Sequence, residues 1–540
     1  MRKVTDTARA AVGMGAIVAF SRAMGFARVL VVAAVLGTSY LGNAFQAANS
    51  LSNVLFELLA AGALSAVLVP TFVRLMSAGD TKGAQEVAGG ILGVAVLGLG
   101  AVAVGVVAAA PLIARLLTLG VPPEVVTEQR ELVTFLLRFF APQVVMYGAG
   151  TIAIAVLHAR RRFAVTVAAP IGSTVVMVAC LLAFGASVQG PPGFDLSAYQ
   201  RWLLVAAGTG GVAAFVGVLL AACRASGFHL WPRLRLRDPR VHEVLRQSGW
   251  GVMLHSAAGL LLGAAIMAGS AVEGAVVAYQ VGWVFFLAPF GILSQPVQTA
   301  ILPELVSEGA GSDLERFRTS VRWALERIAL FVLPVTAAMA ALALPGMRLV
   351  AFGEAADQGP RLLAAAVAAL GVGLFPYGAF LLLARAYYAL NESRFPGVVA
   401  VAASLAGVGV MAIGALTAGG AGRVAMLGAG HTLAYTLGCV VLLRSLGRRT
   451  GGSVMPKRLA TMAAVSAAAG LLVWLASRVA LEGGSGRLYD LAVLAASGVI
   501  GGGLVFLGYR LSGLPAALTQ RPWSLPQAPG SDPAPGGTLP

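Results

Sequence analysis

Long apolar segments recur along nearly the whole chain and are separated by short polar connections. Each segment has about twenty residues or more with few charges, which lets an α-helix cross a hydrocarbon core about 30 Å thick. The pattern predicts an all-α polytopic membrane protein with about fourteen transmembrane helices. The predicted helices cover residues 11–37, 44–72, 87–114, 131–157, 164–187, 201–223, 248–270, 275–303, 321–344, 362–389, 396–418, 424–443, 459–477 and 488–510.

The composition favours a membrane protein over a soluble one. Hydrophobic residues make up 58% of the 540 residues and charged residues only 11%, whereas soluble domains are about 25% charged. Arg2, Lys3 and Arg9 precede the first apolar segment, which continues to Gly37 without a small-residue cleavage site. We therefore expect this segment to remain in the protein as its first helix and not to be a signal peptide.

Basic residues are unevenly distributed among the predicted connections. The chain has 38 Lys and Arg against 22 Asp and Glu, which gives a net charge of +16. If the N-terminus is cytoplasmic, the inside connections and termini contain 25 basic residues and the outside connections contain 8, as the positive-inside rule expects. We predict a multi-pass protein of the inner (plasma) membrane with both termini cytoplasmic. Because no basic stretch is interleaved with aromatic residues on a polar background, nucleic acid is not an expected partner.

A proline pattern recurs at a spacing of 233 or 234 residues. Pro70 in VLVPTFVRL matches Pro303 in AILPELVSE, and Pro142 in FFAPQVVMYG matches Pro376 in LFPYGAF. Six predicted helices separate equivalent points, and this even number gives both copies the same orientation in the membrane. The repeat predicts two six-helix lobes around a central cavity. The predicted parts are 1–223 (first lobe), 224–247 (basic cytoplasmic linker), 248–443 (second lobe), 444–511 (helices 13 and 14) and 512–540 (disordered cytoplasmic tail).

Three charged residues are predicted near the middle of the membrane: Arg22 and Arg28 in the first helix, and Glu57 in the second. A charge at this depth costs at least about 2.5 kcal/mol to insert, so it needs a partner or a wet cavity. Other charges, such as Arg385, are predicted near helix ends, where a long side chain can reach the aqueous interface. The three central charges are therefore the candidate functional group.

Arginine suits phosphate oxygens because its guanidinium binds them through parallel hydrogen bonds. Arg22 and Arg28 are six residues apart, which is about 120° around an ideal helix. A break or kink at Gly25 between them is needed to turn both toward one cavity. We interpret the group as a pyrophosphate site, with Gly25 as a hinge and Glu57 as the counter-ion that the substrate displaces. The alternative is that Glu57 neutralises one arginine and that the group is structural.

The sequence has no pattern typical of catalysis or of a bound cofactor. His255 and His431 are single histidines in apolar segments, with no second ligand at metal spacing. Cys180, Cys223 and Cys439 are far apart and form neither a metal motif nor a disulfide framework. There is no Walker A motif and no credible Ser/His/Asp set. We expect a protein that is not an enzyme and uses no metal or cofactor.

The first two predicted helices resemble those of the MurJ (MviN) lipid II flippase family. The resemblance is carried by SRAMGFARVLVVAAVLG and NAFQAANSLSNVLFELLAAGALSAVLVP, and it continues at LHARRRFAVTVAAP, APFGILSQPVQTAILPEL and RAYYALNESRFP. This family belongs to the multidrug/oligosaccharidyl-lipid/polysaccharide exporter superfamily. The resemblance implies two lobes plus a final helix pair that forms a groove for a polyprenyl tail. It also implies export of lipid II for peptidoglycan synthesis by alternating access.

The resemblance carries over Ser21, Arg22, Arg28 and Asn53 as substrate-binding residues, and Asn43 and Glu57 are added to this candidate set. The expected partners are lipid II, membrane lipids and cell-wall synthesis proteins. The chain departs from the family where acidic or basic residues are expected, which makes its cavity less basic. These departures leave two alternatives: a flippase for another polyprenyl-linked glycan, or a non-transporting membrane scaffold of a cell-wall complex. The departing positions are Asn43, Phe56, Ala61 and Val284.

Overall fold

The computed structural model describes residues 2–56, 62–233, 249–311, 313–357, 359–484 and 486–514. Most of the predicted linker and tail therefore lie outside the described residues. Every regular element in these ranges is helical, which confirms the predicted fold class. Because the predicted spans are apolar on most sides, their backbone groups must pair within each helix if lipid surrounds them.

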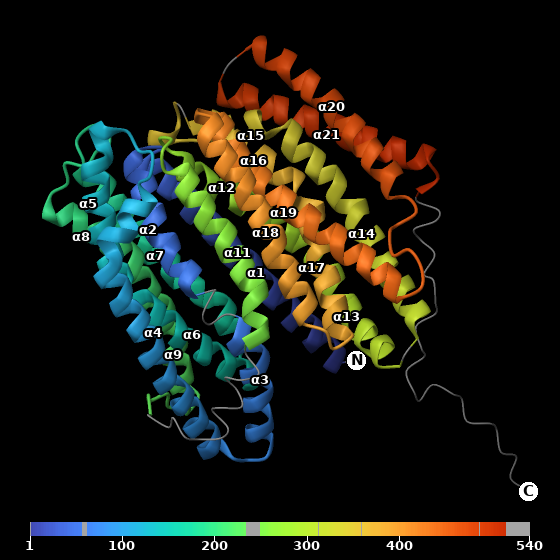
Figure 1. The fold of residues 1–540 in the computed structure, drawn as a ribbon, viewed down its shortest axis with the longest axis horizontal. Coiled ribbons are helices and arrows are strands. Elements are labelled where there is room, and N and C mark those ends of the chain that lie inside the picture. Colours follow the sequence, from blue (N-terminus) through green and yellow to red (C-terminus); the bar gives the residue numbers. More distant parts are fainter. Residues whose placement is uncertain are drawn as a thin grey trace, which may run out of the picture.

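The first lobe consists of the helices up to residue 225 (Figure 1). Short connections join most of these helices, and two of the membrane spans, Pro123–Ala159 and Ala198–Ala225, each consist of more than one element. One terminus has a full capping box, because Ser197 Oγ accepts from Gln200 N and Gln200 Oε1 accepts from Ser197 N. The elements are α1 (Arg2–Leu36), α2 (Tyr40–Phe56), α3 (Gly62–Ser77), α4 (Thr81–Leu117), α5 (Pro123–Phe140), α6 (Pro142–Ala159), α7 (Phe163–Ser187), α8 (Ala198–Val205), the π-helical turn η2 (Ala206–Gly210) and α9 (Gly211–Ala225).

The second lobe follows the linker and lies beside the first, and the last two helices pack along its flank next to α14 (Figure 1). We call the end of the bundle where α1 begins the basal end and the opposite end the distal end. The elements are α11 (Gly249–Gly269), α12 (Ala275–Pro289), the π-helical turn η3 (Phe290–Ser294), α13 (Gln295–Ala310), α14 (Leu314–Ala341), α15 (Ala343–Val350), the 3-10 turn η4 (Gly353–Ala355), α16 (Gly359–Val372), α17 (Leu374–Ala389), α18 (Arg394–Thr417), α19 (Gly420–Arg449), α20 (Leu459–Glu482) and α21 (Arg487–Leu511).

The described residues include 11 helices that are long and apolar enough to cross a membrane, or up to 12 if α16 and α17, which meet at 43°, form one span. Two further predicted helices, 44–72 and 248–270, include residues outside the described set. The count of about fourteen therefore stays a prediction, while the multi-span helical architecture is confirmed.

The two lobes contain the same turn at equivalent places. In the first lobe, α6 ends before Arg161, which has φ of 58°, and Arg162 N donates to Leu157 O at 2.8 Å. In the second lobe, α17 ends before Asn391, which has φ of 59°, and Glu392 N donates to Tyr387 O at 2.9 Å. This 6→1 bond with a left-handed residue is the Schellman ending of a helix. Its recurrence agrees with the repeat inferred from the prolines.

Candidate substrate-binding site

Helix α1 carries both candidate arginines and is continuous through Gly25. The predicted break at Gly25 is absent from this structure, so a hinge at this residue stays a prediction about other conformations. A Cβ atom built on Gly25 would meet no heavy atom within 4 Å of the described neighbours. Gly25 is therefore not needed for close packing, and its position leaves open space beside α1 between Arg22 and Arg28.

Arg22 extends from α1 to the second lobe. Its side chain is exposed, and Nη2 donates to Gln295 Oε1 on α13 at 3.2 Å. Its Nη1 lies so close to Gly291 that a Cβ atom there would be 1.9 Å away. No carboxylate of the described ranges pairs with this guanidinium. Arg22 thus presents donors at the boundary between the lobes while one neutral amide holds it in place.

Arg28 lies six residues, about 1.7 turns, further along α1 and faces the first lobe. It is half-buried, and its charge interacts with the Tyr147 hydroxyl on α6. As for Arg22, no acidic partner is found in the part of the chain that the structure describes. Phe26 packs on Phe285 of α12 with ring centroids 4.7 Å apart. The two arginines therefore lie on different sides of one helix that itself separates the lobes.

The other candidate residues divide into described and undescribed positions. Ser21 is half-buried beside Arg22. Asn53 lies in α2, but its side chain, like the whole of Glu57, is outside the described residues. Val284, where the resemblance implies a basic residue, is partly buried against an apolar cluster to which α1 and α12 both contribute. At this contact between α1 and α12, the chain has apolar packing in place of a second-lobe charge.

Asn43 joins the two lobes in this structure, and its assignment as a substrate-binding residue stays a prediction. Its side chain is fully buried. Nδ2 donates to Val272 O at 2.8 Å, and Oδ1 accepts from Val276 N at 3.0 Å. Both halves of the amide are thus used by the turn that joins α11 to α12. Asn43 connects the first lobe to the second at the distal end.

Sequence reasoning missed a second polar contact on the same face of α2. Ser50, two turns after Asn43, accepts from Gln280 Nε2 of α12 at 2.6 Å. Ser50 is buried and Gln280 is partly buried. In the sequence, Gln280 is an isolated glutamine in an apolar segment, and a polar side chain in such a segment needs a hydrogen-bond partner. Gln295, the neighbour of Arg22, could have been identified in the same way.

Glycines let the distal ends of the lobes approach closely. At Gly274, φ is +72° and a Cβ atom would be 2.5 Å from Thr38. A Cβ atom on Gly42 would be 2.8 Å from Val277 Cγ2, and one on Gly353 would be 2.4 Å from Ala34 O. Side chains at these places would overlap with the opposite lobe. The lobes are therefore in close contact at the distal end.

An apolar groove runs between α14, α17 and α20, on the flank of the second lobe. It has a volume of about 580 Å³ and is lined by small and aromatic residues that include Ala337, Phe375, Ala467 and Trp474. Gly470 permits the contact of α20 with α14, because a Cβ atom there would be 2.9 Å from Ala337 Cβ. A smaller cavity of about 200 Å³ continues between α14, α20 and α21. The groove can accept an extended apolar chain.

Comparison with known proteins gives one consistent family. Residues 32–493 match the family described as "Lipid II flippase MurJ". "Probable lipid II flippase MurJ" of Rhizobium tropici is 25% identical, with 70% of this chain and 69% of the relative covered. "Lipid II flippase MurJ" of Burkholderia cenocepacia is 24% identical, with 87% of this chain and 90% of the relative covered.

Two solved structures share the fold. The structure titled "Lipid II flippase MurJ, inward closed conformation" matches with a TM-score of 0.72 at 17% identity, covering 93% of this chain and 99% of its own. An inward-facing transporter of the multidrug resistance MATE family matches with a TM-score of 0.61 at 15% identity, covering 80% and 94%. At these identities the structures establish the arrangement of helices alone.

Proposed function

The chain belongs to the lipid II flippase MurJ family, and from that premise we propose that it moves lipid II, the undecaprenyl-pyrophosphate-linked peptidoglycan precursor, from the cytoplasmic to the outer leaflet. The lobes alternate between a state open to the cytoplasm and a state open to the outside. In this scheme the chain is a carrier and not an enzyme. Cell-wall synthesis proteins that supply or consume lipid II are its natural partners.

The observation that carries this proposal is the pair of arginines on α1 without a carboxylate partner among the described residues. A half-buried guanidinium that lacks an anion, such as that of Arg28, is unfavourable in an apolar medium, so an anionic ligand is expected to stabilise it. The guanidinium groups of Arg22 and Arg28 can each donate two parallel hydrogen bonds to phosphate oxygens. Because the two side chains leave α1 about 120° apart, they suit a diphosphate that wraps partly around the helix or is passed from one residue to the other.

We place the basal end in the cytoplasm and the distal end outside, following the distribution of basic residues. The contacts of Asn43 and of the glycines then close the outer side. A carrier in this state takes up its substrate from the cytoplasmic side. Opening the distal end requires the Asn43 and Ser50 contacts to separate together, since both join α2 to α12 or to its preceding turn.

We assign the apolar groove beside α20 to the polyprenyl tail. Ala467→Trp, on the lining of this groove, is expected to lower transport of lipid II about tenfold, because the indole fills space that the tail needs. Transport of a short-chain analogue is expected to be nearly unchanged. The comparison uses purified protein in liposomes, and Val479→Trp on the exposed outer face of α20 is the matched control. Equal losses of transport for lipid II and for the short-chain analogue would show that the groove does not bind the polyprenyl tail.

Glu57 is proposed to exchange with the substrate as the partner of an arginine. Glu57→Gln is expected to change the transport rate at least about threefold while the amount of protein in the membrane stays constant, because the charge of the empty site changes. Transport rate and membrane content are measured on the same vesicles. A parallel loss of folded protein and of transport would instead support the structural alternative for the charged group.

Complementation tests the proposed function in cells. A strain depleted of its own lipid II flippase is expected to grow when it expresses this chain and to lyse when it expresses an inactive variant. Failure to complement despite normal insertion, combined with export of a different polyprenyl-linked glycan, would favour the first alternative. The missing charge at Val284 is the observation that keeps this alternative open, because fewer cations line the cavity than the family resemblance implies.

A further inference from the structure

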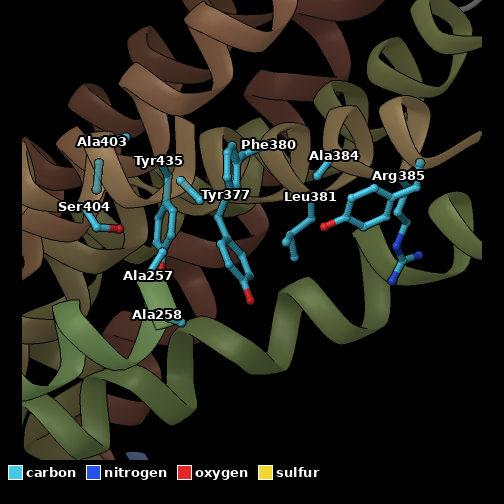
Figure 2. Close-up of a pocket in the computed structure, with 13 residues that line it drawn as sticks. Ala257, Ala258, Tyr377, Phe380, Leu381, Ala384, Arg385, Ala403, Ser404 and Tyr435 are labelled. Carbon is cyan, nitrogen blue, oxygen red and sulfur yellow. The ribbon is translucent and has the colours of Figure 1, made fainter. Parts of the chain in front are cut away.

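A pocket lined mainly by alanine and aromatic residues, with one arginine, lies in the second lobe between α11 and the helices α17, α18 and α19 (Figure 2). Its volume is about 360 Å³, which is within the range of small-molecule sites. Arg385 was expected to extend to the interface at a helix end, but it lines this pocket together with Tyr377, Tyr388 and Tyr435. In Figure 2 the side chains of Tyr377, Tyr435 and Arg385 project from α17 and α19 toward the α11 side.

The pocket is built from fixed aromatic groups. Tyr377 and Tyr435 have ring centroids 4.7 Å apart, and the Tyr435 hydroxyl lies 3.3 Å from His431 Nδ1. His431 in turn contacts the Tyr279 hydroxyl through Nε2 at 2.7 Å and is thus a hydrogen-bonded packing residue. Ser404 adds a buried hydroxyl to the lining. Tyrosine faces and hydroxyls of this kind suit ligands with amide and hydroxyl groups.

Arg385 gives the pocket its charge. No acidic residue belongs to the described lining, and no carboxylate in the described ranges pairs with Arg385. A lone guanidinium favours an anion and disfavours a cation. Tyr377 and Arg385 are eight residues apart on α17, which places these two polar groups about 12 Å apart along the helix, with apolar lining between them. The pocket can therefore hold a short amide-rich segment with a carboxylate at one end.

Helix α13 connects this pocket to the arginine site. Gln295 accepts from Arg22, and Gln298, one turn later, donates to Gly378 O beside Tyr377 at 3.1 Å. On the opposite side, α11 forms a wall of the pocket and also packs on α2 and α3 of the first lobe. The pocket thus lies near the boundary where the proposed diphosphate site is found.

We propose that the pocket around Arg385 is a subsite for the peptide portion of the lipid II headgroup, with the guanidinium binding a peptide carboxylate. The inference rests on the proposed function, and it assigns the two lobes different parts of one substrate. The arginines of α1 bind the diphosphate, while α17 and α19 bind the peptide. The subsite would select lipid-linked glycans that carry a peptide over those that do not.

The test measures binding of two lipids to the purified chain in nanodiscs: lipid II, and the same polyprenyl-diphosphate disaccharide without its peptide. Arg385→Gln is expected to weaken binding of lipid II about tenfold, as for the loss of a charge-assisted hydrogen bond. Binding of the peptide-free lipid should be unchanged. Tyr388→Ala, which alters a side chain 37% exposed, is expected to give a smaller loss of the same selectivity. Arg444→Ala, an exposed arginine on the same lobe outside the lining, is the control.

Equal weakening of both lipids by Arg385→Gln, or no weakening of either, would overturn the subsite. If Arg385→Gln does not fold, Tyr388→Ala decides by the same comparison. Arg22→Ala is expected to weaken both lipids, since both contain the diphosphate. If the unaltered protein binds neither lipid, the proposed function itself is wrong, and this outcome is distinct from failure of the subsite.

Discussion

Arg28→Ala is expected to lower transport of lipid II about 10- to 100-fold while the protein still inserts into the membrane, and Arg22→Ala should have a similar effect. Each variant removes charge-assisted hydrogen bonds to the diphosphate, which contribute about 1.5–3 kcal/mol. Insertion should persist because losing an unpaired charge from an apolar helix lowers the cost of burial. The measurement is the rate at which lipid II reaches the outer leaflet, normalised to membrane content.

Two matched variants separate binding from other roles of α1. Arg138→Ala removes an exposed arginine from α5 of the same lobe and should leave transport unchanged. Gln295→Ala removes the hydrogen-bond partner of Arg22 but keeps the guanidinium, so its expected loss is below about threefold. Full transport in both arginine variants would refute the anion site. A large loss of transport in Gln295→Ala would show that Arg22 acts by joining the two lobes and not by binding the substrate.

Asn43→Leu is expected to prevent stable closure of the distal end and thereby to reduce transport strongly. The variant leaves Val272 O and Val276 N without their buried partner, at a cost of about 1–3 kcal/mol for each group. A cost of this size shifts the balance of closed and open states at least about tenfold. Ala47, one turn from Asn43 and buried at 2% exposure, is a suitable reporter position for cysteine labelling.

The labelling experiment uses Ala47→Cys in a background without the three native free cysteines. A membrane-impermeant thiol reagent applied from outside should label this cysteine slowly in the parent and at least about tenfold faster with Asn43→Leu. Ser39→Ala is the control, because among the described residues its hydroxyl bonds to Leu36 and Gly42, both in the first lobe. Unchanged labelling with Asn43→Leu would show that the amide does not hold the lobes together.

The helical architecture follows from the sequence because hydrophobic length is a local property. An apolar segment of membrane-spanning length has few alternatives to a helix, and the repeated prolines mark equivalent breaks, as between α5 and α6 and between α16 and α17. Individual side-chain roles depend on neighbours distant in the sequence. Asn43 was assigned to the substrate from its place in a motif, yet its partners lie 229 and 233 residues away.

The candidate site could be predicted only in part for the same reason. A charge in an apolar helix identifies Arg22 and Arg28, but periodicity alone cannot say which lobe each side chain faces. Arg385 was placed at a helix end because it is four residues from the predicted boundary at 389. The structure shows that the pocket between α11 and α17 extends to this depth. Depth along a helix therefore did not distinguish a residue that reaches the interface from one that lines a pocket.

The most direct test of the central claim measures flipping of fluorescent lipid II in liposomes that contain only the purified chain. The expected result is transfer of lipid II by the unaltered protein, with loss of transfer in the Arg22→Ala, Arg28→Ala double variant and retention in Arg138→Ala. A polyprenyl-linked glycan without peptide should be moved more slowly by the unaltered protein. Absence of transfer by the unaltered protein, or equal transfer by the double variant, would contradict a guanidinium-based diphosphate carrier.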